Sequence, residues 1–290
     1  MIDLHLHSNC SDGADEPTAL IDIALDLNIK AIALTDHDTI DGIEAFMKYG
    51  ELKDLIVLPG IEISIKHEPR REIEDVHIVG LNIDWKSHLI TKTLEEQMKG
   101  RLDQKKAICK RLRDELGYDI RFDEVQEVAG SNSVGRPHIV QIMEKNNPDI
   151  IRGKTRNELF KMISLGGIAY VDRSFELNLE ESIELIISCG GIPILAHPGI
   201  YEVNNRKKFV QMCVKAGIEG IEVEYPYSKN RPFYDTEKAA WADKVLPKYY
   251  GELADKLGLI KSGGSDYHGN KKDIKIGEVN VPDDYLKKLI

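Results

Sequence analysis

The sequence predicts an α/β fold, a barrel of strands and helices that carries a helical insertion. Two observations lead to this prediction. Short apolar segments alternate with amphipathic helical segments in the first and last thirds of the chain, and this alternation favours a parallel sheet or barrel. The middle of the chain is helical and charged, and no strand signal of similar quality returns before Ile168. At 290 residues, the chain is long enough for a barrel with an inserted domain.

The first third predicts repeated strand–helix units. Leu20, Ile21, Ala24 and Leu25 recur at helical spacing, which indicates a helix that covers an apolar neighbour. Thr39 or Asp41 can cap the next helix. The expected elements in chain order are strand 2–7, helix 17–25, strand 30–35, a helix through 45–49, and strands 55–58, 61–65 and 76–81.

The charged middle segment predicts a small helical domain, and the strand–helix rhythm resumes after it. We therefore expect 1–98 and 167–290 to form the barrel and 99–166 to form the insertion. The expected elements are helices 89–116 and 122–128, a helix that starts near 135–140, helix 179–188, strand 192–196, helix 207–215, strand 218–224, helix 252–257 and strand 259–264.

Composition narrows the functional classes. Hydrophobic residues make up 42% and charged residues 30%, as in soluble globular proteins, and no window approaches a membrane span. The start of the chain does not resemble a signal peptide, and the four cysteines show no CxxC pairing, so we expect a cytoplasmic protein. A net charge of −10 disfavours a surface for long nucleic acids, but small phosphorylated substrates suit an acidic chain that binds divalent metals.

Histidines and carboxylates follow the expected strands at their C-terminal ends. In a barrel these ends converge on one face, where such folds place their chemistry. Imidazole and carboxylate sets suit Mn²⁺, Fe²⁺ or Zn²⁺, and the set is too large for one ion. The candidates are His5 and His7 on one face of the first strand, Asp12, Asp36 and His37, Glu62, His77, which starts strand 76–81 near the same region, His197, and Asp266 with His268.

Several of these candidates also have a purely structural interpretation. Asp12 precedes a glycine and suits a turn, Asp36 can cap the following helix, and Asp266 can be an N-cap after a Gly-Gly turn. Glu62 differs, because it is a carboxylate inside an apolar strand, and a buried charge must be paired or bound to metal.

The chain resembles the polymerase and histidinol phosphatase (PHP) family of metal-dependent phosphoesterases. Seven motifs in the family's order carry the resemblance. Gly135-Arg136-Pro137-His138, inside a helical insertion, further resembles the branch with nucleoside 3′,5′-bisphosphate phosphatases and short-RNA 5′ exonucleases. The seven motifs are Asp3-Leu4-His5-Leu6-His7, Ser11-Asp12-Gly13, Thr35-Asp36-His37-Asp38, Pro59-Gly60-Ile61-Glu62, Val76-His77-Ile78, Ala196-His197-Pro198 and Gly264-Ser265-Asp266-Tyr267-His268-Gly269.

The resemblance implies a distorted (β/α)₇ barrel of the amidohydrolase-like kind with up to three divalent ions, Mn²⁺, Fe²⁺ or Zn²⁺. Relatives often have a histidine in place of Asp12, so the third ion is the one most open to test. By motif, His5, His7, Glu62 and Asp266 would hold the first ion, Glu62, His77 and His197 the second, and Asp12, His37 and His268 the third.

The resemblance also implies a mechanism, hydrolysis of a phosphomonoester by a hydroxide that bridges the first two ions. Asp266, His268, Arg136 and His138 would take part in catalysis. Arg136 would orient the phosphate, and His138 would contact it or donate a proton to the leaving oxygen. The insertion 99–166 would contribute to the substrate site, and Arg136, His138, Tyr170 and Arg173 would contact the substrate.

Three functions compete at this stage. The first is a phosphatase that acts on a small nucleotide, a nucleoside 3′,5′-bisphosphate or a nucleoside monophosphate. The second is a 5′ to 3′ exonuclease on short RNA. The third is a non-catalytic metal-binding module, which predicts loss of ligands, whereas every motif position is occupied in this chain.

Overall fold

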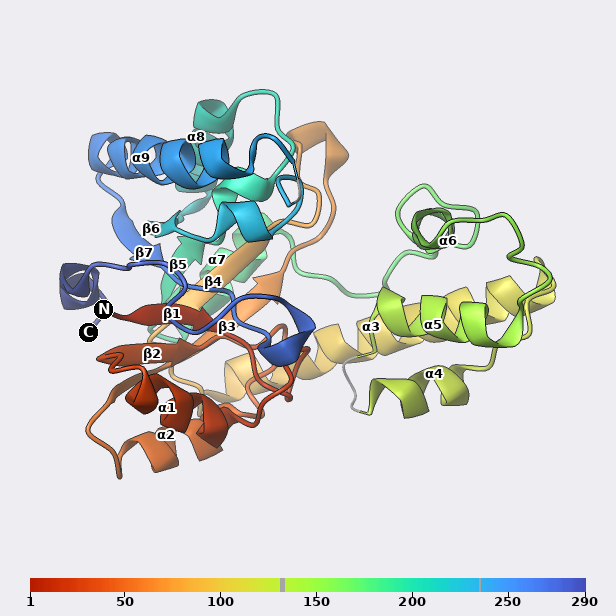
Figure 1. Cartoon of the computed structure of the whole chain (residues 1–290), viewed down its shortest axis with the longest axis horizontal. Helices are drawn as coiled ribbons and strands as arrows, with labels where there is room; N and C mark the ends of the chain where they lie inside the picture. Colours follow the sequence, from red (N-terminus) through yellow and green to blue (C-terminus); the bar gives the residue numbers. More distant parts are fainter. Residues whose placement is uncertain (131–133, 235) are drawn as a thin grey trace. The chain divides into compact units, whose positions relative to one another are not determined.

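The computed structural model describes residues 1–130, 134–234 and 236–290. It divides into two compact units (Figure 1). The barrel unit consists of Met1–Thr93 and Leu177–Ile290, and the helical unit is Leu94–Glu176. The helical unit has wider bounds than the 99–166 that the sequence predicts for the insertion. Within the described ranges, the helices lack the length and apolar character that crossing a bilayer requires.

The barrel unit is built on one seven-stranded sheet whose strand order follows the chain order. The α/β barrel class that the sequence predicts is confirmed, with one correction: the sheet is not wholly parallel, because β4 runs antiparallel to both of its neighbours. The segment between β3 and β4 contains only a 3₁₀ turn, too little for the crossover that parallel strands need. The strands are β1 Asp3–Leu6, β2 Ala31–Leu34, β3 Ile56–Ser64, β4 His77–Leu81, β5 Ile192–Leu195, β6 Gly220–Glu224 and β7 Ile260–Gly263.

The two edges of the sheet meet just beyond β7. Leu6 and Tyr267 form an isolated parallel bridge. The amide of His7 donates to the carbonyl of Tyr267 at 3.0 Å, and the amide of Asp266 donates to the carbonyl of His5 at 2.9 Å. These bonds place the segment after β7 directly beside the end of β1, so residues from the two ends of the chain share one site.

Helices cover the outside of the sheet (Figure 1), with α1 and α2 beside β2 and β3 and α9 beside β6. Pro17 starts α1, where its missing amide proton costs nothing. Helix α9 is longer than the predicted 252–257, because it continues through Pro247, a residue that normally interrupts a helix. The described α-helices that lie wholly within this unit are α1 Pro17–Asp26, α2 Ile43–Gly50, α7 Leu179–Ser188, α8 Arg206–Ala216 and α9 Ala239–Leu257.

Each unit has a buried apolar cluster. The cluster in the barrel unit joins Leu4, Ala33, Leu58 and other strand residues to the C-terminal segment through Leu286. The helical unit buries Ile108, Val125, Ile139, Leu159 and further side chains from the helices that the structure describes there. Those helices are α3 His88–Asp114, α4 Phe122–Ala129, α5 Arg136–Asn146 and α6 Arg156–Ile163.

A matched pair of glycines tests how closely the end of β1 is packed. A Cβ at Gly264 would lie 2.5 Å from the backbone nitrogen of His5, whereas a Cβ at Gly251 in α9 would meet only Val223 Cγ1 at 3.5 Å. We expect Gly264→Ala to lower the free energy of unfolding by about 1–3 kcal/mol. Gly251→Ala should raise it by about 0.5–1 kcal/mol, because alanine favours the helix. Chemical denaturation measures both, and a similar change in the two variants would contradict the packing.

Candidate metal centre

The carboxylate of Glu62 is the centre of a buried cluster of histidines. Glu62 lies inside β3, and its side chain is fully buried. Its Oε1 lies 2.9 Å from a ring nitrogen of His77 and 2.9 Å from Nε2 of His197. Its Oε2 lies 3.2 Å from Nε2 of both His5 and His7 and 3.1 Å from Nδ1 of His37. One carboxylate therefore faces five imidazoles.

Asp266 adds a second carboxylate to the side of the cluster formed by β1. Its Oδ1 lies 3.2 Å from His7 Nε2, and the ring nitrogens of His5 and His7 lie 3.1 Å apart. The two histidines therefore point to the same side of β1, as the alternation along the strand predicts. The ligand atoms of His5, His7 and Asp266 lie close enough to hold one ion.

A further group surrounds Asp12. The Oδ1 of Asp12 lies 3.2 Å from Nε2 of His268 and 3.7 Å from Nδ1 of His7, and its Oδ2 lies 4.0 Å from His37 Nε2. The side chain of Asp12 is half exposed, unlike that of His7. These four residues can hold an ion at the outer side of the cluster.

The donor atoms of this cluster are suited to bind divalent ions, because several of them form no hydrogen bonds with one another. Among the described residues, Glu62 Oε2 and the Nδ1 atoms of His7, His37 and His197 are buried without a hydrogen-bond partner. Buried polar atoms are normally paired, and a cation between them would supply the missing partner. The structure also groups His37, Glu62 and His77, whereas the resemblance places His37 on the third ion. The assignment of each ligand to one ion stays a proposal.

The carboxylates control the charge of the histidines. Burial lowers the pKa of His7, but the adjacent carboxylates of Asp266 and Glu62 outweigh burial and raise this pKa to about 9. For His37 burial prevails and lowers the pKa to about 3. Burial raises the pKa of Glu62, yet the imidazoles around it hold this pKa well below its usual range. An ion that binds His7 at neutral pH must therefore displace a proton.

A layer of further side chains holds the candidate ligands in place. Glu222 on β6 is buried, its Oε1 lies 2.9 Å from His5 Nδ1, and its Oε2 accepts the backbone N–H of His197 at 2.6 Å. Tyr225 and Lys272 donate to Asp266 Oδ2 at 2.8 and 2.7 Å. Tyr225 and Lys272 were not among the residues that the sequence singles out, and nothing in their local sequence marks them.

Asp36 belongs to this outer layer and is neither a helix cap nor a member of the candidate ligand groups. Its carboxylate accepts hydrogen bonds from the backbone amide and the hydroxyl of Ser8 at 2.7 and 2.6 Å and from the hydroxyl of Ser11. These bonds shape the loop that follows β1. The cap interpretation of Asp36 is therefore wrong, since the next helix has Gly42 at its N-cap.

The backbone is strained at two of the candidate ligands. His197 has a φ of 28° and Asp266 a φ of 55°, in the left-handed region that side chains other than glycine seldom adopt. Both residues belong to the candidate ligand groups. Such strain persists only where surrounding contacts enforce it, and it gathers at functional sites.

The other predicted site residues belong to the helical unit. Arg136 starts α5 and donates from Nη1 to Ser164 Oγ at 3.1 Å. His138 Nδ1 accepts the backbone N–H of Gly135 at 3.1 Å, which leaves the proton of a neutral ring on Nε2. The carbonyl of Tyr170 accepts from Arg111 at 3.0 Å. Arg173 donates from Nε to Gln104 Oε1 at 3.3 Å.

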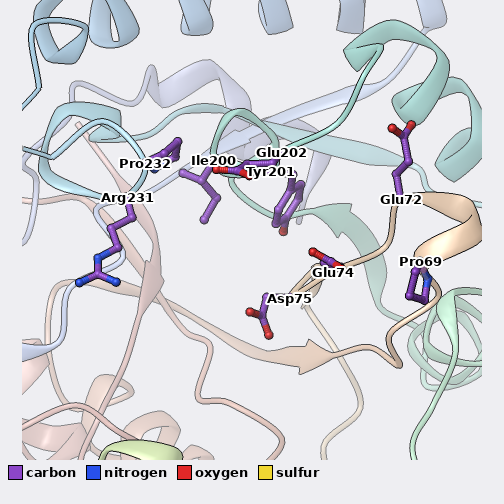
Figure 2. Close-up of a pocket in the computed structure, with 9 residues that line it drawn as sticks. All are labelled: Pro69, Glu72, Glu74, Asp75, Ile200, Tyr201, Glu202, Arg231 and Pro232. Atoms are coloured by element: carbon purple, nitrogen blue, oxygen red, sulfur yellow. The ribbon is translucent and has the colours of Figure 1, made fainter. Parts of the chain in front are cut away.

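A pocket of about 460 Å³ adjoins the candidate centre through Tyr201. The hydroxyl of Tyr201 accepts the backbone N–H of His77 at 3.0 Å, and its ring packs edge-on against His197 with centroids 5.5 Å apart. Figure 2 shows Arg231 and Glu72 at opposite sides of this pocket. The lining is Pro69, Glu72, Glu74, Asp75, Ile200, Tyr201, Glu202, Arg231 and Pro232, with four carboxylates and one guanidinium.

The comparison with protein families identifies the class. The model of the PHP domain matches residues 3–149, which include the candidate ligands from His5 to His77. The chain therefore belongs to the PHP domain family. It is an enzyme, a metal-dependent hydrolase of phosphoric esters, and the non-catalytic alternative is not supported.

Individual relatives are similar over nearly the whole chain. The 5′-3′ exoribonuclease Rnm of Escherichia coli (strain K12) is 29% identical, with 95% of this chain and 87% of that protein aligned. The 3′,5′-nucleoside bisphosphate phosphatase of Chromobacterium violaceum is also 29% identical, with 92% and 87% aligned. A metal-dependent phosphoesterase structure from Bifidobacterium adolescentis superimposes with a TM-score of 0.75 at 25% identity, over 99% of this chain and 94% of that one.

Substitutions of two glutamates on β6 test whether the side chains around the candidate ligands hold them in position. We expect Glu222→Gln to weaken Mn²⁺ binding about 10–100-fold, because the amide removes the negative charge beside His5 Nδ1. Glu224→Gln is the control, since Glu224 lies on the same strand, is half exposed and interacts with Lys261 and Tyr285. Calorimetric titration of Mn²⁺ into the metal-free protein measures both. Equal affinities in the two variants would show that Glu222 does not position the ligands.

Proposed function

We propose that this protein hydrolyses a phosphomonoester of a small nucleotide, a nucleoside 3′,5′-bisphosphate or a nucleoside monophosphate. The observation that carries this proposal is the convergence of five imidazoles on Glu62, with Asp266 and Asp12 beside them. Divalent ions held by these residues would polarise the phosphoryl group and activate the water that attacks it. The ions of this proposal are Mn²⁺, Fe²⁺ or Zn²⁺, up to three in each chain.

The chain's own residues have separate tasks in this proposal. Asp266 and Glu62 supply the negative charge that holds the ions, and Tyr225 and Lys272 keep Asp266 in place. The planar fork of Arg136 would bind two phosphate oxygens and stabilise the charge that develops on them. His138 would donate the proton on Nε2 to the leaving oxygen, since its Nδ1 already accepts the N–H of Gly135.

One observation supports a small substrate: the chain has a net charge of −10, which disfavours long polyanions. The exonuclease remains the second candidate, because the Escherichia coli exoribonuclease is as similar to this chain as the bisphosphate phosphatase.

A panel of substrates tests whether the protein acts as a phosphatase on small nucleotides or as an exonuclease on short RNA. With Mn²⁺ present, we expect phosphate release to be fastest from a nucleoside 3′,5′-bisphosphate, with loss of the 3′ phosphate. The panel also holds nucleoside monophosphates, phosphorylated amino acids and short 5′-phosphorylated RNA, and the readout is kcat/KM for each. A preference for the oligonucleotides over every small ester would reject the phosphatase and favour the exonuclease.

Two substitutions test separately the proposed role of Asp266 in metal binding and that of Arg136 in phosphate binding. Asp266→Asn should lower kcat more than about a hundredfold, because it removes the negative charge of a proposed metal ligand. The variant should stay folded, because Tyr225 and Lys272 can still donate hydrogen bonds to the asparagine side chain. Arg136→Ala should instead lower kcat/KM about tenfold or more, the usual cost of a lost charge-assisted hydrogen bond. Steady-state kinetics and thermal unfolding measure these effects, with Arg152→Ala as the exposed control. Wild-type rates in both variants would refute the assigned roles.

A further inference from the structure

A short segment after β2 holds the backbone of Glu62. The ladder between β2 and β3 ends at Pro59, and residues 36–38 continue it beside the last part of β3. The N–H of Glu62 donates to the carbonyl of Asp36 at 3.1 Å, and the N–H of Asp38 donates to the carbonyl of Glu62 at 2.9 Å. Glu62 thus has both of its backbone hydrogen-bonding groups paired with this segment.

The side chain of Asp38 adds a third bond to this pairing. Asp38 is only 1% exposed, and its Oδ1 accepts the N–H of Ser64, the last residue of β3, at 2.9 Å. A regular parallel ladder would direct that N–H to the backbone carbonyl of Asp38, because the bonds of such a ladder are evenly spaced along the strands. The carboxylate therefore takes the place of a main-chain acceptor at the end of the strand.

Asp38 adopts a strained backbone conformation at this point. Its φ is 53°, in the left-handed region that glycine enters without penalty and that Asp and Asn tolerate better than most residues. Glycine would serve the turn equally well, but it would not supply the acceptor for the N–H of Ser64. The carboxylate of Asp38 thus has a task beyond the turn, although Asp38 belongs to none of the candidate ligand groups among the described residues.

Ser64 lies between the elements that carry two candidate ligands. On one side of β3, the segment that contains Asp38 also carries His37, whose Nδ1 lies 3.1 Å from Glu62 Oε2. On the other side, Ser64 lies opposite His77 in the ladder between β3 and β4, and His77 Nδ1 lies 2.9 Å from Glu62 Oε1. A shift of the end of β3 would therefore change the distance from Glu62 to both imidazoles at once.

We propose that Asp38 is a positioning residue for Glu62, and that it acts through the N–H of Ser64. Its hydrogen bond keeps the end of β3 in register with both neighbouring elements, so that the carboxylate of Glu62 faces the imidazoles in a geometry that divalent ions can use. The inference rests on the proposed function, because that function needs ions at Glu62. It also gives a task to the last residue of the motif Thr35-Asp36-His37-Asp38.

Three variants of the full chain test this role. Asp38→Gly keeps the left-handed backbone but removes the acceptor, whereas Asp38→Asn keeps a side-chain oxygen at the same place. Asn28→Gly is the matched control, because Asn28 is exposed between α1 and β2 and has a similar φ of 55°. With Mn²⁺ titrated into the metal-free protein in a calorimeter, we expect Asp38→Gly to weaken binding about tenfold or more. Asp38→Asn should stay within about twofold of the wild type, and Asn28→Gly should not differ from it.

The visible spectrum of the Co²⁺-loaded protein separates positioning from a general effect on folding. This spectrum depends on the arrangement of the ligands, so Asp38→Gly should change it and Asn28→Gly should not. A lower midpoint of chemical denaturation in Asp38→Gly, with the Co²⁺ spectrum and the Mn²⁺ affinity unchanged, would overturn the proposal. An equal loss of affinity in Asp38→Asn would overturn it as well, because the charge rather than the hydrogen bond would then matter. Neither measurement uses a substrate, so the proposal can fail while the phosphatase activity holds, or hold while the substrate panel rejects the phosphatase.

Discussion

The arrangement of the barrel unit depends on the burial of one carboxylate, that of Glu62. A lone charge in an apolar strand would be costly, and the structure compensates it with five imidazoles on its two oxygens. Imidazoles this close to one another repel when protonated, and several of their ring nitrogens have no hydrogen-bond partner among the described residues. Cations between these groups would relieve both problems, so metal binding and the stability of this unit are coupled.

The direction of β4 follows from the same requirement. His77 is the first residue of β4, and β4 pairs antiparallel to β3 with Ser64 opposite His77. A parallel β4 would carry His77 to the opposite edge of the sheet, away from Glu62. The closure of the sheet matters equally, because the bonds of His5 and His7 to the segment after β7 bring Asp266 to the end of β1. Candidate ligands from the first and last parts of the chain thus meet at one edge.

The two units concentrate opposite kinds of chemistry. The barrel unit gathers imidazoles and carboxylates, which suit divalent cations, whereas the helical unit places Lys105 near three arginines. The net charge of −10 conceals this division, since it averages over the whole chain. Bound cations would reverse the local field of the carboxylates in the barrel unit, so that unit could accept a phosphate ester despite its acidic groups.

The sequence by itself determined the α/β class, most element positions and the candidate ligands, because strand alternation, helical spacing and motif order are local properties of the chain. Tertiary structure alone decided the antiparallel direction of β4, the two oxygens of Glu62 that divide five histidines between them, and the outer partners Tyr225 and Lys272. It also decided the burial of Lys105, which looks like one more charge on a polar helix in the sequence. These features depend on which distant residues become neighbours, and no local pattern encodes that.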